Sequence, residues 1–158
     1  LSLRRQRQMC IRDRYINRPE ATSESITNGW LHTGDIARMD EDGFLYIVDR
    51  AKDMVLRGGE NIYCAEVEAA IYEHPAVAEC TAFSVPDDRL GEEVGVAIYK
   101  NDNILASAEE IRESCRSKIA GHKIPRYIWF LDDPIPRNAN GKFLKRELKD
   151  SLDTSAAN

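Results

Sequence analysis

Short runs of apolar residues alternate with polar turns along the chain, and this pattern predicts strands and short helices. Short apolar runs bounded by turn residues indicate strands in these segments: Ile36–Met39, Phe44–Val48, Met54–Leu56, Val77–Val85, Val94–Lys100 and Tyr127–Leu131. Apolar residues at helical spacing indicate helices in these: Glu20–Ile26, Ala65–Glu73, the segment after Ser107, and Leu144–Leu152. Because strands and helices alternate without an internal repeat, we predict an α+β fold in which helices cover a small mixed sheet.

Turn-forming residues set the predicted ends of these elements. Ser107 and Glu110 have the spacing of a capping box, so a helix is expected to begin there and to end at Gly121. This helix places three apolar residues on one face: Ile111, Cys115 and Ile119. The polar loop Pro86–Glu92 is predicted to separate the two longest strands, and Asn28–Gly29 is predicted to form a turn.

Two structured parts are predicted. Residues 15–50 contain a β-hairpin, with its turn at Asp40–Gly43, and are expected to be the end of a β-rich unit. Charged residues replace apolar ones in Asp49–Asp53, so the domain boundary is placed there. Residues 51–152 then form one small domain, and residues 153–158 form a tail.

Residues 1–14 differ from the rest of the chain. They contain five arginines and little apolar periodicity. One interpretation is a basic arm that binds nucleic acid; the other, which we favour, is a poorly ordered or non-native start. The segment has no apolar core of the kind found in secretory signals.

Composition narrows the function classes. The net charge of -5 and the pI of about 5.3 give no global basic field, so nucleic acid is not an expected partner. No apolar run approaches the roughly 20 residues of a membrane helix, so no transmembrane segment is expected. The four cysteines lack metal-ligand spacing, which favours reduced thiols in a cytoplasmic protein and no protein-held metal: Cys10, Cys64, Cys80 and Cys115.

Three loops carry chemistry that a folded core does not need. In the first, Asp35 follows a glycine at the start of a strand, where a carboxylate can accept two hydrogen bonds from a ribose diol or, alternatively, bond backbone N–H groups of its own turn. The second runs from Arg50 and Lys52 to the tight loop Gly58–Asn61. It is either a solvated linker with a glycine turn or a place where backbone approaches a ligand.

The third loop ends at Lys142, directly after Asn140–Gly141. Asn-Gly is a strong turn former, so the lysine is expected to project from a loop tip. A lysine there suits a phosphate or a developing oxyanion, although an isolated surface lysine is ordinarily only solvated.

The order and spacing of these loops resemble the adenylate-forming superfamily, which includes acyl-CoA synthetases, adenylation domains of peptide synthetases and beetle-type luciferases. The matching stretches are Gly29–Asp35, Gly43–Asp53, Arg57–Tyr63 and Asn140–Lys142. Arg57–Tyr63 looks most like fatty-acyl-CoA synthetases. Cys64 departs from the pattern, because many relatives have proline there. We expect Cys64 to be a small packed residue rather than a reactive thiol.

The resemblance implies a role for each matched residue in making an acyl-adenylate from a carboxylate and ATP and in transferring the acyl group to coenzyme A. Asp35 and Arg50 would contact the ribose, and Lys52 would be the hinge of a mobile lid. Gly58 and Gly59 would line the path of coenzyme A. Lys142 would be the catalytic lysine that reaches the α-phosphate of ATP or AMP.

The same resemblance implies that most of the enzyme is missing. Residues 15–50 would be the end of a large AMP-binding domain, and residues 51–152 its C-terminal lid. Mg²⁺ would be bound mainly through ATP and the absent domain. Two other functions stay open: a non-catalytic lid-like binding module, and an adenylation domain that loads a carrier protein. The acid that is activated cannot be read from this sequence.

Overall fold

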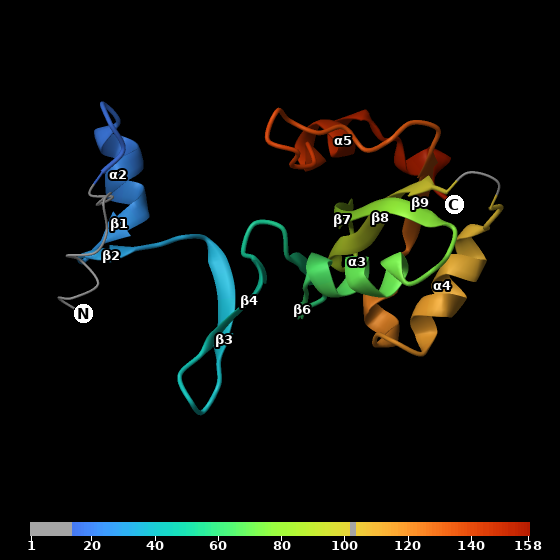
Figure 1. The fold of residues 1–158 in the computed structure, drawn as a ribbon, viewed down its shortest axis with the longest axis horizontal. Coiled ribbons are helices and arrows are strands. Elements are labelled where there is room, and N and C mark those ends of the chain that lie inside the picture. Colours follow the sequence, from blue (N-terminus) through green and yellow to red (C-terminus); the bar gives the residue numbers. More distant parts are fainter. Residues whose placement is uncertain (1–13, 102–103) are drawn as a thin grey trace. The chain divides into compact units, whose positions relative to one another are not determined.

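A computed structural model describes residues 14–101 and 104–158 (Figure 1). These residues divide into two compact units, residues 1–35 and residues 36–158, and each is described by itself. The predicted basic segment, apart from Arg14, lies outside the described residues.

The first unit is a short helix followed by a small hairpin. Helix α2 spans Pro19–Ser25, and strands β1 (Ile26–Thr27) and β2 (Trp30–Leu31) pair antiparallel. The proline at the first position of α2 has the fixed φ that a helix start requires. Asn28 and Gly29 both have positive φ, 53° and 79°, as a two-residue hairpin turn demands. The predicted helix and turn are therefore confirmed.

The second unit begins with the predicted hairpin. Strand β3 spans Asp35–Met39 and pairs with β4, Leu45–Arg50. The carboxylate of Asp40 closes the turn, because it accepts hydrogen bonds at 2.8 Å from the Phe44 N–H and from the Tyr46 hydroxyl. These bonds, the one from Phe44 first, lower the pKa of Asp40.

Five strands form the sheet of the second unit. They are β5 (Val55–Arg57), β6 (Glu60–Ile62), β7 (Val77–Asp87), β8 (Gly91–Lys100) and β9 (Tyr127–Leu131). The order is β6-β5-β8-β7, and β9 also pairs with β8. Only the β8–β9 pair among these is parallel, so the sheet is mixed, as predicted.

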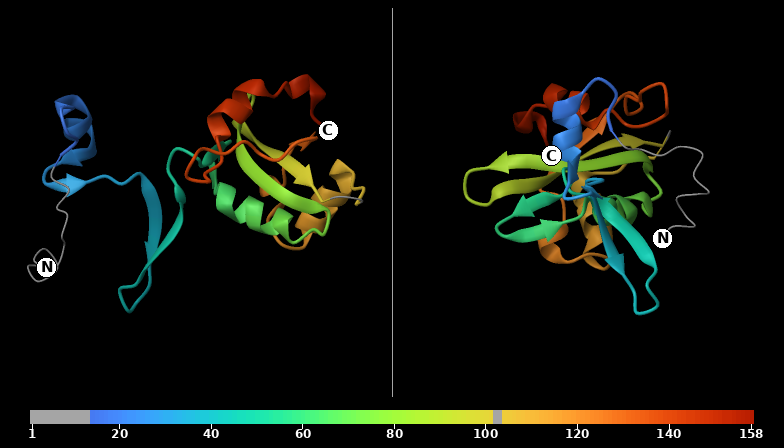
Figure 2. Two further views of the ribbon diagram at one scale, coloured as in Figure 1. Left: turned by 45° about the horizontal axis from the view of Figure 1, so that its top comes forward. Right: turned by 90° about the vertical axis from the view of Figure 1, so that its left-hand side faces the viewer.

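Helices cover both faces of this sheet (Figure 2). On one face, α3 (Cys64–Tyr72) and α4 (Ala108–Arg116) enclose a core of aliphatic residues and cysteines. On the other, α5 (Lys145–Ser151) covers a second core built around Trp129 and Phe83. Two short 3₁₀ helices, Gly121–Lys123 and Thr154–Ala156, complete the unit. The predicted α+β class is confirmed.

Several strand boundaries differ from the prediction. Glu60–Ile62, predicted partly as loop, is strand β6, because the turn at Gly58–Gly59 folds these polar residues back onto β5. Strands β7 and β8 extend into the predicted loop Pro86–Glu92, since Pro86 pairs with Glu92. Their actual turn is closed by the Asp87 carboxylate, which accepts hydrogen bonds from the N–H groups of Arg89 and Leu90.

The capping box of α4 is present, but the helix is shorter than predicted. Ser107 accepts a hydrogen bond from the Glu110 N–H, and the Glu110 side chain accepts one from the Ser107 N–H. The helix ends at Arg116, so Ile119 lies beyond it, although Ile119 is buried in the same core. Gly121 begins the 3₁₀ helix rather than ending α4.

Cys64 is the small, packed residue that we expected. It is buried at the start of α3, and its thiol donates a hydrogen bond to the carbonyl oxygen of Asp53 at 2.7 Å. Burial raises the pKa of Cys64 to about 12, so the thiolate is scarce at neutral pH.

Candidate functional site

The β7–β8 ribbon carries a candidate loop at each end. The loop that bears Lys142 is anchored to Glu79, near the start of β7. The turn formed by Gly58 and Gly59 is anchored beside Leu90, which follows the end of β7. From Glu79 to Asp87 the strand advances eight residues, or about 26 Å at 3.3 Å per residue. The anchors of the two loops are therefore far apart on one rigid support.

Asn138 organises the tip of the Lys142 loop. Its side-chain oxygen accepts hydrogen bonds at 3.0 Å from the N–H groups of Asn140 and Lys142. Its backbone N–H donates to the Lys142 carbonyl at 2.9 Å, and its carbonyl accepts from the Gly141 N–H at 2.9 Å. Gly141 has a φ of 77°, which a side chain would disfavour. The predicted Asn-Gly turn is thus a closed, hydrogen-bonded loop.

Two pairings close the base of this loop. Arg137 and Phe143 form an isolated antiparallel bridge, and the Leu144 N–H donates to the Pro136 carbonyl at 2.8 Å. The Arg137 guanidinium also lies over the Phe143 ring, 4.1 Å from its centroid. Helix α5 follows at once, so the loop is continuous with a packed element.

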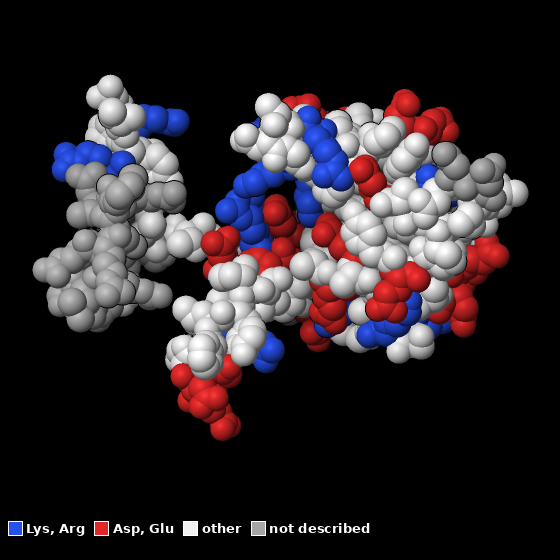
Figure 3. All heavy atoms as spheres, in the orientation of Figure 1, with Lys and Arg blue, Asp and Glu red and all other residues white. Residues whose placement is uncertain are grey.

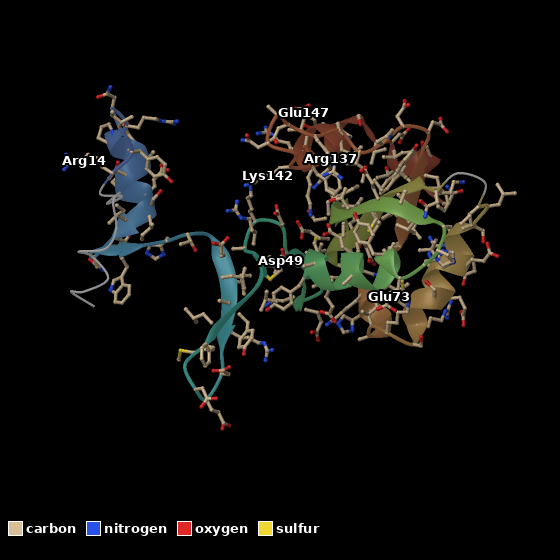
Figure 4. All side chains as sticks on the ribbon, viewed as in Figure 1. Arg14, Asp49, Glu73, Arg137, Lys142 and Glu147 are labelled. Atoms are coloured by element: carbon tan, nitrogen blue, oxygen red, sulfur yellow. The ribbon has the colours of Figure 1, made fainter. Side chains whose placement is uncertain are left out.

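The Lys142 side chain is left unpaired. It is exposed and makes no hydrogen bond or ion pair with any residue in the described part of the chain. Figure 4 shows Lys142 on the loop that precedes α5, pointing away from the sheet, whereas Arg137 lies between the loop and the sheet. The assignment of Lys142 to a phosphate stays a prediction; the structure shows an exposed ammonium group with no partner among the described residues.

The Gly58–Gly59 turn offers backbone instead of charge. Their φ values of 57° and 92° form a two-residue hairpin turn between β5 and β6. The Gly58 N–H donates to the Leu90 carbonyl at 2.8 Å, and a Cβ at Gly58 would lie 3.1 Å from a Leu90 methyl. A Cβ at Gly59 would meet nothing within 4 Å, so this residue faces open space.

Carboxylates of β8 hold the strand that leads into this turn. Glu92 accepts a hydrogen bond from the Leu56 N–H at 2.8 Å. Buried Glu93 forms an ion pair with Arg57 at 2.7 Å, and this hydrogen bond raises the pKa of the Arg57 guanidinium. The glycine turn therefore leaves a well-bonded strand.

Lys52, the predicted hinge residue, lies in a β-turn directly after β4. The Asp53 N–H donates to the Arg50 carbonyl at 3.0 Å, which places Lys52 at the third position of that turn. Asp49 and Asp53 tie the stretch to α3: Asp49 accepts a weak hydrogen bond from the Ala65 N–H at 3.3 Å, and Asp53 accepts one from Cys64. Lys52 itself is exposed between these two contacts.

A groove of about 170 Å³ joins this linker to α5. Its basic lining comes from both segments, and Figure 3 shows the blue basic side chains on this part of the second unit. The residues that line it are Lys52, Asp53, Ala82, Phe83, Ser84, Lys145, Arg146 and Lys149. The structure therefore places the predicted hinge residue beside the helix that follows Lys142.

Lys145 fixes the first turn of α5 to the rest of the domain. Its ammonium donates to Glu68 of α3 at 2.8 Å and to the Ala82 carbonyl at 3.3 Å. Glu68 also accepts from the Ala82 N–H and from the Thr81 hydroxyl. Burial alone would lower the pKa of Lys145, but the charge and hydrogen bond of Glu68 outweigh it and raise this pKa.

The predicted ribose contacts lie in separate units. Asp35 is the first residue of β3 and the last residue of the first unit; its N–H donates to the Thr33 hydroxyl at 3.2 Å. Arg50 ends β4 in the second unit, and its N–H donates to the Asp49 carboxylate at 2.8 Å. Both side chains are exposed. Their assignment to a ribose stays a prediction.

Sequence reasoning missed the residues that hold these loops. Glu79, Glu68 and Lys145 were not among the candidates, although each joins segments far apart in the chain. Arg137, which precedes Lys142 in the third loop, was given no role. A carboxylate pointing from a strand that otherwise buries apolar residues, as Glu79 does in β7, was the available signal.

The described residues do not supply a metal site. They contain no group of three or more His, Cys, Asp or Glu side chains that could hold an ion, so they form no all-protein metal cage. Binding of Mg²⁺ through ATP and a further domain stays a prediction. Within residues 14–101 and 104–158, no helix has the length and apolar character needed to cross a bilayer.

Comparison with known proteins finds similarity to AMP-binding enzymes and CoA ligases. Residues 66–142, which end at Lys142, match the family model of the AMP-binding enzyme C-terminal domain. A 2-succinylbenzoate–CoA ligase from Bacillus cereus is 46% identical over 135 residues. That match covers 85% of this chain and 27% of the ligase, so the chain spans about a quarter of this relative.

Solved structures of two further enzymes have the same fold. The o-succinylbenzoate CoA synthetase of Bacillus subtilis, in complex with its acyl-adenylate intermediate, has a TM-score of 0.80 and 40% identity, over 89% of this chain and 28% of that one. A fatty acyl CoA synthetase of Mycobacterium tuberculosis has a TM-score of 0.66 and 40% identity, over 90% of this chain and 28% of that one.

Proposed function

We propose that this chain, whose residues 66–142 match the AMP-binding enzyme C-terminal domain, is the lid-bearing part of an AMP-forming acid–thiol ligase. Such an enzyme converts a carboxylic acid and ATP into an acyl-adenylate and pyrophosphate, and then transfers the acyl group to coenzyme A. The observation that carries the proposal is Lys142: an unpaired cation on a closed loop, at the end of the family match.

In the first half-reaction, Lys142 binds the α-phosphate and the attacking carboxylate. Negative charge gathers on the phosphoryl oxygens as the acid oxygen bonds to phosphorus and pyrophosphate leaves. A cation that is already in place stabilises this charge without reorganising at the moment of reaction. Asp35 and Arg50 would hold the ribose at the same time.

In the second half-reaction, the thiol of coenzyme A attacks the acyl carbon and AMP leaves. The Gly58–Gly59 turn would line the path of the pantetheine arm, since Gly59 faces open space. The anchors of this turn and of the Lys142 loop lie at opposite ends of the β7–β8 ribbon. The lid therefore has to rotate between the two steps, and Lys52 is the proposed hinge.

The acid is the finer part of the proposal. We infer that 2-succinylbenzoate is the first acid to test, because a ligase named for it is 46% identical to this chain and a solved synthetase for it has a TM-score of 0.80. A fatty acid is the second candidate, supported by the fatty acyl CoA synthetase at a TM-score of 0.66. Apart from Lys142, which binds the carboxylate that every candidate acid has, no described residue is assigned to the acid.

The test is a chimera in which residues 15–158 replace the corresponding C-terminal segment of the B. cereus ligase. We expect it to form the coenzyme A thioester of 2-succinylbenzoate, and we expect the isolated 158-residue chain to be inactive, since Lys142 alone cannot orient ATP. A folded chimera that binds ATP but does not exchange pyrophosphate would contradict the proposal and favour the non-catalytic binding module. Turnover with a carrier protein in place of coenzyme A would support the other alternative.

A further inference from the structure

We propose that Glu79 and Arg137 are positioning residues that hold Lys142 for adenylation. The inference rests on the proposed function, and it concerns how the loop is fixed rather than what Lys142 does. Lys142 itself has no side-chain partner among the described residues, so its location depends entirely on its loop.

Arg137 connects the tip of that loop to the sheet. One guanidinium nitrogen donates to the Gly141 carbonyl at 2.9 Å, and the other donates to the Glu79 carboxylate at 2.8 Å. Gly141 immediately precedes Lys142. A planar guanidinium makes these two bonds in a fixed geometry, which lysine could not reproduce. A single side chain thus fixes the residue before Lys142 relative to β7.

Glu79 anchors the other side of the loop base. Its second carboxylate oxygen accepts a hydrogen bond from the Ile135 N–H at 2.9 Å, and Ile135 is buried in the second core. The carboxylate therefore bonds both the start of the loop and the arginine that holds its tip. It also neutralises Arg137, which leaves Lys142 as the uncompensated cation of the loop.

The Glu79–Arg137 pair should contribute much less to the stability of the domain than the buried core does. The Arg137 side chain is 45% exposed, and exposed ion pairs contribute little to stability. The loop still packs through Ile135 and Phe143 without it. Loss of the pair should therefore displace Lys142 while changing the unfolding free energy of the domain little. A displacement of about 1 Å can lower the rate about a hundredfold.

The test uses the chimera with Arg137→Gln or Glu79→Gln. We expect ATP–pyrophosphate exchange to fall by about tenfold to a hundredfold, mainly in kcat, while thioester formation from supplied acyl-adenylate changes by less than about twofold. Arg137→Lys should recover only part of the loss. The matched control is Glu66→Gln, which removes an ion pair of 2.7 Å with Lys123 elsewhere in the domain and should spare both activities.

The Lys142→Ala background separates this inference from the proposed function. If Arg137 acts through Lys142, adding Arg137→Gln to Lys142→Ala should lower adenylation by no more than about twofold. Multiplying losses, equal losses in both half-reactions, or Arg137→Gln matching the Glu66→Gln control would overturn the positioning role. Full activity of Lys142→Ala would instead refute the proposed function.

Amide exchange in the 158-residue chain gives a check that does not need activity. The Ile135 N–H donates to Glu79 and should exchange faster in Glu79→Gln, and the Gly141 and Lys142 N–H groups should exchange faster in Arg137→Gln. Amides of α3 should keep their wild-type rates. Unchanged exchange at all three loop amides would contradict the proposal.

Discussion

The two loops at the ends of the β7–β8 ribbon use opposite chemistry on the same support. The Lys142 loop presents one long cationic side chain and satisfies its backbone hydrogen bonds within the loop itself. The Gly58–Gly59 turn presents bare backbone, and Gly59 leaves open space where a side chain would stand. One suits a phosphate and the other suits the passage of a thin ligand arm, so a single rigid domain can serve two chemical steps.

Both loops depend on a glycine with positive φ and on carboxylates of the ribbon. Gly59 has a φ of 92° and Gly141 a φ of 77°. Glu92 and Glu93 hold the strand before the first loop, whereas Glu79 holds the second. The sheet thus fixes the positions of both loops, and in the proposed function rotation about the linker would select which of them faces the reaction.

The largest effect should come from the charge itself. Lys142→Ala in the chimera should lower adenylation by about 10²–10³-fold, as for the loss of one preorganised donor. ATP–pyrophosphate exchange measures this loss. Acetylating Lys142 neutralises the amine and should have the same effect. Thioester formation from supplied acyl-adenylate should survive better, and equal losses in both steps would mean that Lys142 is structural.

The second-largest effect should come from a proline at the proposed hinge, which should change the two half-reactions unequally. Lys52→Pro fixes φ and removes an N–H group at the third position of the Arg50–Asp53 turn, so a rotation of the lid that changes this φ should suffer. We expect adenylation to be retained and thioester formation to fall about tenfold or more, as mutations at hinges change gating. Lys52→Ala keeps the torsional freedom and is the control. Parallel changes in both activities of the proline variant would remove the hinge assignment.

The anchor of α5 should affect the stability of the second unit. Lys145→Met leaves Glu68 without its cation, and we expect a loss of about 1–3 kcal/mol in unfolding free energy. The control is Lys149→Met, since Lys149 donates only to the neutral Ser84 hydroxyl. Because the pKa of Lys145 is raised, the part of the difference that comes from its charge should be fully present below about pH 10.4 and be lost as the pH rises through its folded pKa. Denaturant unfolding at several pH values measures it, and a pH-independent difference would contradict the ion-pair account.

The smallest effect should lie at the glycine end. Hydrogen bonds from the N–H groups, with that of Leu90 the largest cause, lower the pKa of Asp87. Its stabilisation is therefore present above its usual pKa, about 3.9, and is lost as the pH falls through the lower folded value. Asp87→Asn should be slightly less stable than the wild type at neutral pH and equal to it in strong acid. Thermal unfolding from acid to neutral pH would reveal a constant difference if the turn did not depend on this charge.

Local sequence patterns predicted most of the helices and strands but not the contacts between segments far apart in the chain. The β3–β4 hairpin, α3 and the capping box of α4 follow from signals within a few residues. Strand β6 was not recognised, because its polar residues become a strand only by pairing with β5. A hydrophobic period, whether that of a strand or that of a helix, carries no information about such a partner.

The candidate site divides in the same way. The Asn140–Gly141 turn and its exposed lysine were predictable, because both features are local. The bond from Arg137 to Glu79 joins residues 58 positions apart, and the bond from Lys145 to Glu68 joins residues 77 apart. Only a folded domain brings these pairs together, so the residues that hold the loop were visible only in the structure.

A matched pair of glycine variants tests most directly whether the Gly58–Gly59 turn serves thioester formation and the Lys142 loop serves adenylation. Gly59→Ala and Gly141→Ala each place a Cβ at positive φ with nothing within 4 Å, so the backbone strain is similar and no clash distinguishes them. The measurement is the ratio of thioester formation from supplied acyl-adenylate to ATP–pyrophosphate exchange in the chimera. Our account predicts that this ratio falls in Gly59→Ala and rises in Gly141→Ala. A ratio that moves in the same direction in both variants, or stays at the parent value in both, would contradict it.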